Sequence, residues 1–208
     1  MIEQEEVFFS EEQSLQLITQ MIQKAKNDFV ETGISALLWG SIIPFCSLVQ
    51  FISFYHPFGG AEYVWILTFL AVIPQVIISV KENKNKKFKG YHESAMGGIW
   101  IAFAISMFLL SFYFSFLSSQ GIDINKLHQD TLYLIIYGIP TFSTGIGRRF
   151  KPMIIGGIAC WALAIISVFT TYPYNMLLMA AGAILAWFIP GLILQRRYKN
   201  AKKEQQHV

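Results

Sequence analysis

Six apolar stretches, almost free of charged side chains, make up most of this chain. They lie at roughly 34–55, 61–80, 95–117, 131–147, 152–172 and 176–194. A helix of about 20 residues crosses a hydrocarbon core of ~30 Å. Backbone groups find no water inside lipid, so spanning segments form helices or closed barrels. Because the apolar runs are continuous rather than alternating, they predict an all-α, polytopic integral membrane protein with six transmembrane helices.

Basic residues alternate between the segments that join these stretches. Of the 16 Lys and Arg residues, only Lys126 follows an odd-numbered stretch. The others precede the first stretch or follow even-numbered ones: Lys24, Lys26, Lys81, Lys84, Lys86, Lys87, Lys89, Arg148, Arg149, Lys151, Arg196, Arg197, Lys199, Lys202 and Lys203. The positive-inside rule therefore predicts that both termini are cytoplasmic. The fourth stretch is the shortest, but removing it would break the alternation.

Composition agrees with a membrane location. Hydrophobic residues make up 54% of the chain and charged residues 14%, against about 25% charged residues in soluble domains. The net charge of +3 follows from the basic cytoplasmic loops, so nucleic-acid binding is not expected. The acidic first 30 residues do not resemble a cleavable signal peptide. Cys46 and Cys160 both fall inside spans and are expected to pack as small apolar residues.

The segments outside the spans differ in character. Residues 1–10 form an acidic tail, 11–32 an amphipathic helix, 33–195 the six-helix domain and 196–208 a basic cytoplasmic tail. Apolar residues recur on one face of the amphipathic helix at Leu15, Ile18, Ile22, Ala25 and Phe29. This helix at 11–31 either lies on the inner leaflet or the protein's own loops, or docks a protein partner.

A weak threefold pattern runs through the six stretches. Trp39, Trp100 and Trp161 lie in the odd-numbered ones, and Ile-Pro pairs in the even-numbered ones contain Pro74, Pro140 and Pro190. Each of these prolines precedes the first basic residue by six to eight positions, which places the three at a similar depth. Three successive helical hairpins would give this pattern. Chance recurrence is the alternative, because Gly and Pro are frequent in membrane helices.

The prolines mark the candidate site. Each removes a backbone donor and kinks its helix, either to shape the bundle only or to form a hinge or binding site. Residues 138–147 of the fourth stretch also combine three glycines with the hydroxyl side chains of Thr141, Ser143 and Thr144, which can line a polar cavity. The candidate polar and kink site comprises Gln75, Pro74, Pro140, Thr141, Ser143, Thr144 and Pro190. Arg148 and Arg149 either contact an anionic solute or lipid headgroup, or serve as ordinary topology charges.

Small residues predict close helix packing. Gly98, Ala102 and Ser106 form one ladder at four-residue spacing, and Gly182, Ala186 and Pro190 form another. Such ladders pack either within a bundle or between protomers, so a homo-oligomer is compatible with the sequence.

An enzyme, a metal site or a cofactor is not predicted. Apart from Glu62 at the edge of the second stretch, the six stretches contain no His, Asp or Glu, whereas catalysis requires such groups at an active depth. The outer loops hold His56, Glu62, Asp123, His128 and Asp130, which could converge on a metal. They are scattered and are expected to be accessible to solvent, so a metal site is disfavoured. Proton-coupled transport is also disfavoured, because proton relays use buried carboxylates or His.

Two segments carry a family resemblance. Residues 21–29 (MIQKAKNDF), Thr32-Gly33 and residues 38–41 (LWGS) resemble the opening of an uncharacterised family of bacterial six-transmembrane-helix inner membrane proteins. Residues 186–191 (AWFIPG) are similar to that family's end. The resemblance covers nearly the whole chain and implies a bacterial inner (cytoplasmic) membrane location. It implies no activity.

Two functions therefore remain open. The favoured hypothesis is a non-enzymatic regulatory or accessory component of the membrane that acts through protein partners, because the 11–31 helix is amphipathic and the outer loops are short. The alternative is a small transporter or channel, with a pathway near the proline-kinked even-numbered helices.

Overall fold

The chain is helical in the computed structural model, which describes residues 15–16, 32–85 and 91–206. Its helices are α2 (Ile34–Tyr55), η1 (Ala61–Tyr63), α3 (Ile66–Asn85), α4 (Tyr91–Ser119), η2 (Ile124–Leu127), α5 (Gln129–Gly147), α6 (Lys151–Val168), α7 (Tyr174–Ala183), η3 (Ile184–Phe188) and α8 (Ile189–Gln206). The all-α prediction is confirmed for these residues. The tail at 1–10 and the amphipathic helix at 11–31 lie outside the described residues, apart from residues 15 and 16.

Helix boundaries differ from the predicted ones at several ends. A 3₁₀ turn occupies Ala61–Tyr63, so α3 begins at Ile66 instead of 61. The fifth stretch is apolar as far as 172, but α6 ends at Val168. The predicted basic tail continues the last helix to Gln206. Apolar content sets the predicted limits, whereas a helix ends where its backbone hydrogen bonding stops, and in α8 that point lies beyond the basic residues.

Four of the described helices are long and apolar enough to cross a membrane. They are Ile34–Tyr55, Ala95–Ser119, Lys151–Val168 and Tyr174–Lys203. This number supports a multi-pass membrane protein. The second and fourth predicted spans correspond to α3 and α5, which contain Pro74 and Pro140.

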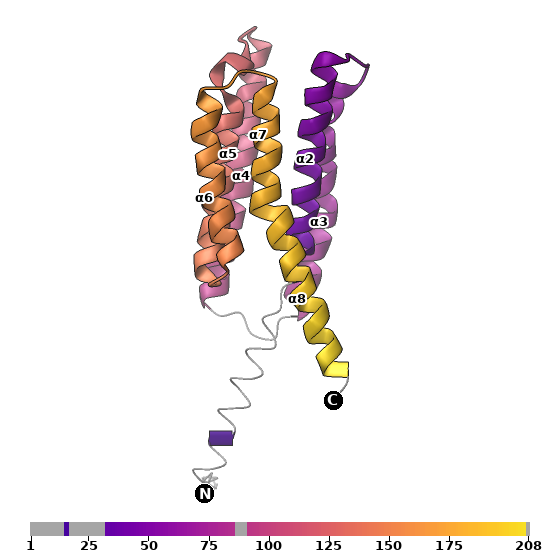
Figure 1. Cartoon of the computed structure of the whole chain (residues 1–208), viewed down its shortest axis with the longest axis vertical. Helices are drawn as coiled ribbons and strands as arrows, with labels where there is room; N and C mark the ends of the chain where they lie inside the picture. The colour runs from indigo at the N-terminus through magenta and orange to yellow at the C-terminus, as the bar shows by residue number, and fades with distance from the viewer. Residues whose placement is uncertain (1–14, 17–31, 86–90, 207–208) are drawn as a thin grey trace, which may run out of the picture.

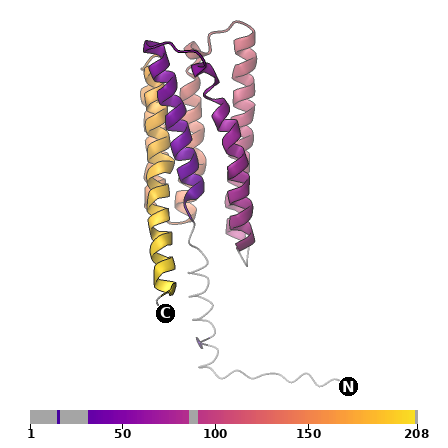
Figure 2. The same ribbon diagram turned by 90° about the vertical axis from the view of Figure 1, so that its right-hand side faces the viewer.

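The bundle is organised around α5, α6 and α7. The most extensive packing joins α5 and α6, and α7 packs on α2, α5 and α6. Helix α3 packs on α2, and α4 packs on α5 (Figure 1). Figure 2 shows α2 beside the continuous helix formed by α7, η3 and α8. The last helix therefore links the α2–α3 pair to the α4–α5–α6 group.

A π-helical turn interrupts that last helix. Over Ile184–Phe188 the backbone widens, and the N–H of Ile189 donates to the carbonyl of Ile184. Pro190 follows directly and removes the donor that would bond Ala186. Below this turn α8 runs in a different direction from α7 (Figure 1). The predicted kink at Pro190 is thus present, and the π turn shares in it.

Glycines let neighbouring helices hold this turn from two sides. A Cβ added to Gly40 of α2 would lie 2.4 Å from the backbone nitrogen of Phe188. A Cβ added to Gly156 of α6 would lie 2.6 Å from the carbonyl oxygen of Leu185. Both distances are shorter than van der Waals contact allows, so only glycine fits. Helix association in lipid depends on such close packing.

The two predicted small-residue ladders lie in different surroundings in the structure. In the last helix, Gly182, Ala186 and Pro190 are all buried, which confirms packing inside the bundle. In α4, a Cβ added to Gly98 would have no described atom within 4 Å, and Ala102 and Ser106 are exposed. The α4 ladder therefore packs on no other described part of this chain.

Candidate functional site

One face of α5 carries four buried polar side chains. Asp130, Tyr137, Thr141 and Thr144 follow each other at spacings of seven, four and three residues. These spacings place them on one side of a helix with 3.6 residues per turn. All four are buried, with exposures between 0% and 3%. We call this group the polar face of α5.

Two tryptophans donate to the C-terminal half of the polar face. The indole Nε1 of Trp100 in α4 donates to the Thr144 hydroxyl at 3.0 Å. The indole Nε1 of Trp187 in the π turn donates to the Thr141 hydroxyl at 2.9 Å. Thr141 in turn donates to the carbonyl of Tyr137 at 2.8 Å. Buried indole N–H groups need such acceptors, so threonine hydroxyls join α5 to two neighbouring helices.

Aromatic rings enclose these hydrogen bonds. The rings of Tyr137 and Trp187 lie 4.7 Å apart, and Phe103 of α4 lies 6.1 Å from Trp187. Phe103 also contacts Trp100 at 5.5 Å in an edge-on arrangement. The surrounding rings exclude water, which strengthens polar interactions at the same level.

Gln75 forms a second polar group, between α2 and α3. Its Oε1 accepts from Nε1 of Trp39 at 3.1 Å. Its Nε2 donates to the hydroxyls of Ser35 at 3.1 Å and Ser79 at 3.0 Å. The residue after Pro74 therefore uses its amide to connect helices, which is the usual role of a membrane-buried amide.

The predicted site residues thus separate into two groups. The structure brings Pro140, Thr141 and Thr144 together with the helix of Pro190, whereas Pro74 and Gln75 lie on α3. Ser143 lies on another side of α5, because its position differs from Thr141 by two residues. Trp100 and Trp187 were not predicted as site residues, although Trp100 belongs to the threefold pattern and Trp187 precedes Pro190 by three positions.

The threefold pattern is only partly repeated in the contacts. Trp39 of α2 donates to Gln75 of α3, and Trp100 of α4 donates to Thr144 of α5. In both cases the acceptor lies in the next long helix along the chain. Trp161 instead donates back to the carbonyl of Ile135 in α5 at 3.2 Å. It lies across Gly138, where an added Cβ would come within 2.3 Å of Nε1. The third hairpin therefore departs from the pattern of the first two.

Asp130 differs from the prediction that it is accessible to solvent. It is 3% exposed, because α5 begins at Gln129 and turns the side chain into the bundle. Burial raises the pKa of this carboxyl from 3.8 to about 6, and the nearby His128 opposes the rise. Among the described residues, the buried side-chain atoms without a hydrogen-bond partner are Oγ of Ser47 and Nδ1 of His128.

Other polar side chains close the same end of the bundle. The hydroxyls of Thr131 and Ser167 lie 2.6 Å apart between α5 and α6. Thr170 donates to the side-chain oxygen of Asn175, which is 1% exposed at the start of α7. The hydroxyl of Tyr133 lies 3.2 Å from that of Ser111 in α4. Among the described residues, no three His, Cys, Asp or Glu side chains gather into a metal site.

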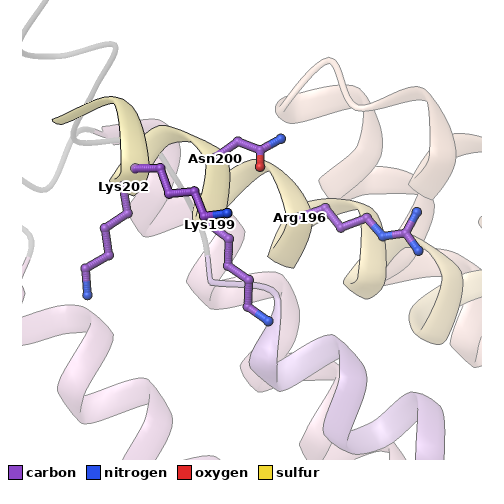
Figure 3. A pocket seen from close by; sticks show the side chains of 5 residues that line it. Arg196, Lys199, Asn200 and Lys202 are labelled. Atoms are coloured by element: carbon purple, nitrogen blue, oxygen red, sulfur yellow. The ribbon is translucent and has the colours of Figure 1, made fainter. Parts of the chain in front are cut away.

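The opposite end is basic. Arg148, which follows α5, is half-buried, and burial lowers its pKa to about 10; Arg149 is exposed. The guanidinium of Arg197 lies 5.1 Å from the ring centre of Phe150, between these arginines and α6. On α8 a shallow cleft is lined by Arg196, Lys199, Asn200, Lys202 and Lys203 (Figure 3). The basic turn and the basic helix therefore meet at one end of the bundle.

The two cysteines are small packing residues in the structure. Cys46 and Cys160 are both free and 0% exposed. The Cys46 thiol donates to the carbonyl of Val64 at 3.4 Å, and the Cys160 thiol to that of Gly182 at 3.6 Å.

Comparison of the chain with protein-family models, with curated proteins and with solved structures found no match.

Proposed function

We propose that this protein is a six-span protein of the bacterial inner membrane, with both termini cytoplasmic, and that it acts as a small transporter or channel. The described ends of α3, α5 and α8 carry the basic residues at the end of the bundle where α2 begins (Figure 1). That distribution supports the topology, because basic loops stay in the cytoplasm.

The hydrogen bond between Trp187 and Thr141 carries the transport proposal. It joins the π turn of the last helix to the polar face of α5. Interrupted membrane helices line solute sites in transporters, and π turns occur often at functional sites. Movement of α8 about Pro190 would shift Trp187 and release the Thr141 hydroxyl to a passing solute.

The lining chemistry selects the solute class. At this level the polar face offers hydroxyl groups and indole N–H groups, and Tyr137, Thr141 and Thr144 carry no charge at neutral pH. Hydroxyl groups can exchange their protein hydrogen bonds for bonds to a polar solute. The proposed substrate is therefore a small, uncharged polar molecule.

An osmotic swelling assay on proteoliposomes tests this function. The purified full-length protein is challenged with a panel of small polyols, amides and sugars. We expect faster swelling than in protein-free liposomes for at least one solute, and a several-fold loss in Thr141→Val. Ser106→Ala is the matched control, because it removes one hydroxyl from an exposed position on α4. Swelling equal to protein-free liposomes across the panel would reject the transport function.

A regulatory or accessory role is a second candidate, favoured by the open face of α4. Gly97 and Gly98 both have free space where a Cβ would be, and small residues of this kind admit a neighbouring helix. Isolation of the intact protein from native membranes in mild detergent tests it. A second protein in fixed ratio supports this role, whereas a monomer or homo-oligomer alone speaks against it.

A further inference from the structure

Asp130 is the one described carboxylate that is both buried and placed on the polar face of α5. Its exposure is 3%, and it begins the series that continues through Tyr137 to Thr141 and Thr144. The other described acidic residues with assigned burial, Glu82 and Asp123, are half-buried and exposed. Position alone therefore distinguishes Asp130 as the outermost group of this face.

An ionised carboxylate in this place is poorly solvated, because Asp130 is only 3% exposed. The polar groups nearby are occupied with one another: Thr131 and Ser167 share a hydrogen bond, and Thr170 donates to Asn175. A buried charge without a partner is strongly unfavourable. Binding of a proton removes that charge, so the site favours the neutral carboxylic acid.

His128 provides a second, independent observation at the same end of α5. Its Nδ1 is buried and has no hydrogen-bond partner in the part of the chain that the structure describes. It precedes α5 directly, with a positive φ of 48°. The buried Asp130 carboxyl and this unpartnered nitrogen thus lie two residues apart at the entrance to α5. His128 as a whole residue is half-exposed, so the entrance to α5 reaches the outer surface of the bundle.

The surrounding helices add few other charges. Tyr133 and Tyr137 lie within electrostatic reach of Asp130 on its own helix. The packed helices contribute uncharged groups at this end, namely Ser111 from α4, Ser167 and Thr170 from α6 and its end, and Asn175 from α7. The preceding turn η2 carries Lys126, which is exposed. Among these groups, His128 is the one that opposes the rise in the pKa of the Asp130 carboxyl.

We propose that Asp130 is a proton-binding residue of the pathway, loaded from the outer side, and that its protonation regulates solute passage along α5. The proposal rests on the transport function. In the step, a proton from the outer aqueous phase bonds to a carboxylate oxygen of Asp130 and later returns to solution, with no other bond made or broken. The raised pKa of this carboxyl agrees with proton uptake in the mildly acidic range.

Carboxyl ¹³C NMR of the full-length protein in lipid nanodiscs tests proton binding directly. The chain has three aspartates, Asp28, Asp123 and Asp130, so selective labelling gives three signals. Loss of one signal in Asp130→Asn assigns it. We expect the Asp130 signal to titrate about two pH units above an ordinary Asp carboxyl. Titration of Asp130 at the ordinary Asp value would overturn the proposal.

Regulation is tested by measuring swelling with the same protein from about pH 4.5 to 8. This range brackets the titration of a carboxyl whose pKa is raised in this way. We expect the wild-type rate to change several-fold around the titration of Asp130, and the Asp130→Asn rate to be independent of pH. Asp123→Asn is the matched control, because Asp123 is an exposed aspartate of the same outer segment. An unchanged pH profile in Asp130→Asn would also overturn the proposal. Absence of swelling in every variant would instead reject the transport function, since the NMR titration does not depend on it.

Discussion

Trp187 and Thr141 lie on different helices, 46 positions apart in sequence, and share a hydrogen bond of 2.9 Å. Trp187 sits in the π turn, and Thr141 follows the kink-forming Pro140. The bond therefore connects the π turn to the proline-containing helix α5, at the level where the ring of Phe103 in α4 lies 6.1 Å from the ring of Trp187.

A double-mutant cycle should detect this bond. We expect Trp187→Phe and Thr141→Val each to destabilise the protein, with a coupling energy of about 1 kcal/mol, because membrane-buried hydrogen bonds have this order of strength. Reversible unfolding in mixed micelles measures it. Thr141→Ser keeps the acceptor and should retain most of the coupling to Trp187. Strictly additive single effects would show that the bond contributes nothing.

Alanine at Gly40 should damage the contact between α2 and the π turn. The added Cβ would meet the backbone of Phe188 at 2.4 Å, and backbone cannot rotate away. We expect a loss of roughly 1–3 kcal/mol in stability, as for other overpacked sites. Gly98→Ala is the matched control, because an added Cβ there would meet no described atom within 4 Å. Equal thermal stability of the two variants would contradict the predicted packing.

Stability should fall as pH rises through the titration of Asp130. The folded carboxyl has its pKa raised from 3.8 to about 6, so the folded state holds the proton more tightly than the unfolded state. The contribution of this bound proton to the free energy of unfolding is fully present below pH 3.8 and is lost as pH rises to about 6. Its size is roughly 3 kcal/mol at about 1.36 kcal/mol per pKa unit.

Asp130→Asn provides the test of that pH dependence. The amide stays neutral at every pH, so the variant should lose less stability than the wild type between about pH 4 and 7, the range over which the buried carboxyl ionises. Unfolding at several pH values in one detergent measures the difference. A wild-type pH profile in Asp130→Asn would mean that other groups cause the dependence.

Cysteine labelling should establish the six-span topology. Cys46→Ala and Cys160→Ala give a background without the two buried thiols. Single cysteines at Lys84, Lys151 and Lys203, all exposed, should react only when a membrane-impermeant reagent reaches the cytoplasmic face. A cysteine at Lys126, also exposed, should react from the outside. Labelling of the cysteines at Lys84 and Lys151 from opposite sides of the membrane would mean that the chain has fewer than six spans.

Removal of residues 1–31 separates the two candidate functions. If the protein acts through a partner bound by the predicted helix at 11–31, the truncated chain should lose the partner and keep its detergent-solubilised fold. If it acts as a transporter, the truncated chain should keep most of its swelling activity. Circular dichroism confirms that the remaining helices persist in the truncated chain.

The sequence alone determined the helical class and the membrane setting. Long apolar runs must hydrogen-bond internally in lipid, so the all-α body and its apolar helices could be predicted from composition and length. Local chemistry also marked Pro140, Thr141, Thr144 and Pro190 as a candidate site. These signals are local: a proline removes its own donor, and a threonine carries its own hydroxyl, wherever the helix packs.

Only the tertiary structure decided which faces meet. Seven-residue spacing put Asp130 in line with Tyr137 and Thr144, but burial of Asp130 depends on how α6 and α7 cover the start of α5. Likewise, Gly40 and Gly98 look equivalent in sequence, whereas one touches Phe188 and the other faces open space. Helix association in lipid follows the fit of particular surfaces. That fit brings Trp187 to Thr141, and no local pattern specifies it.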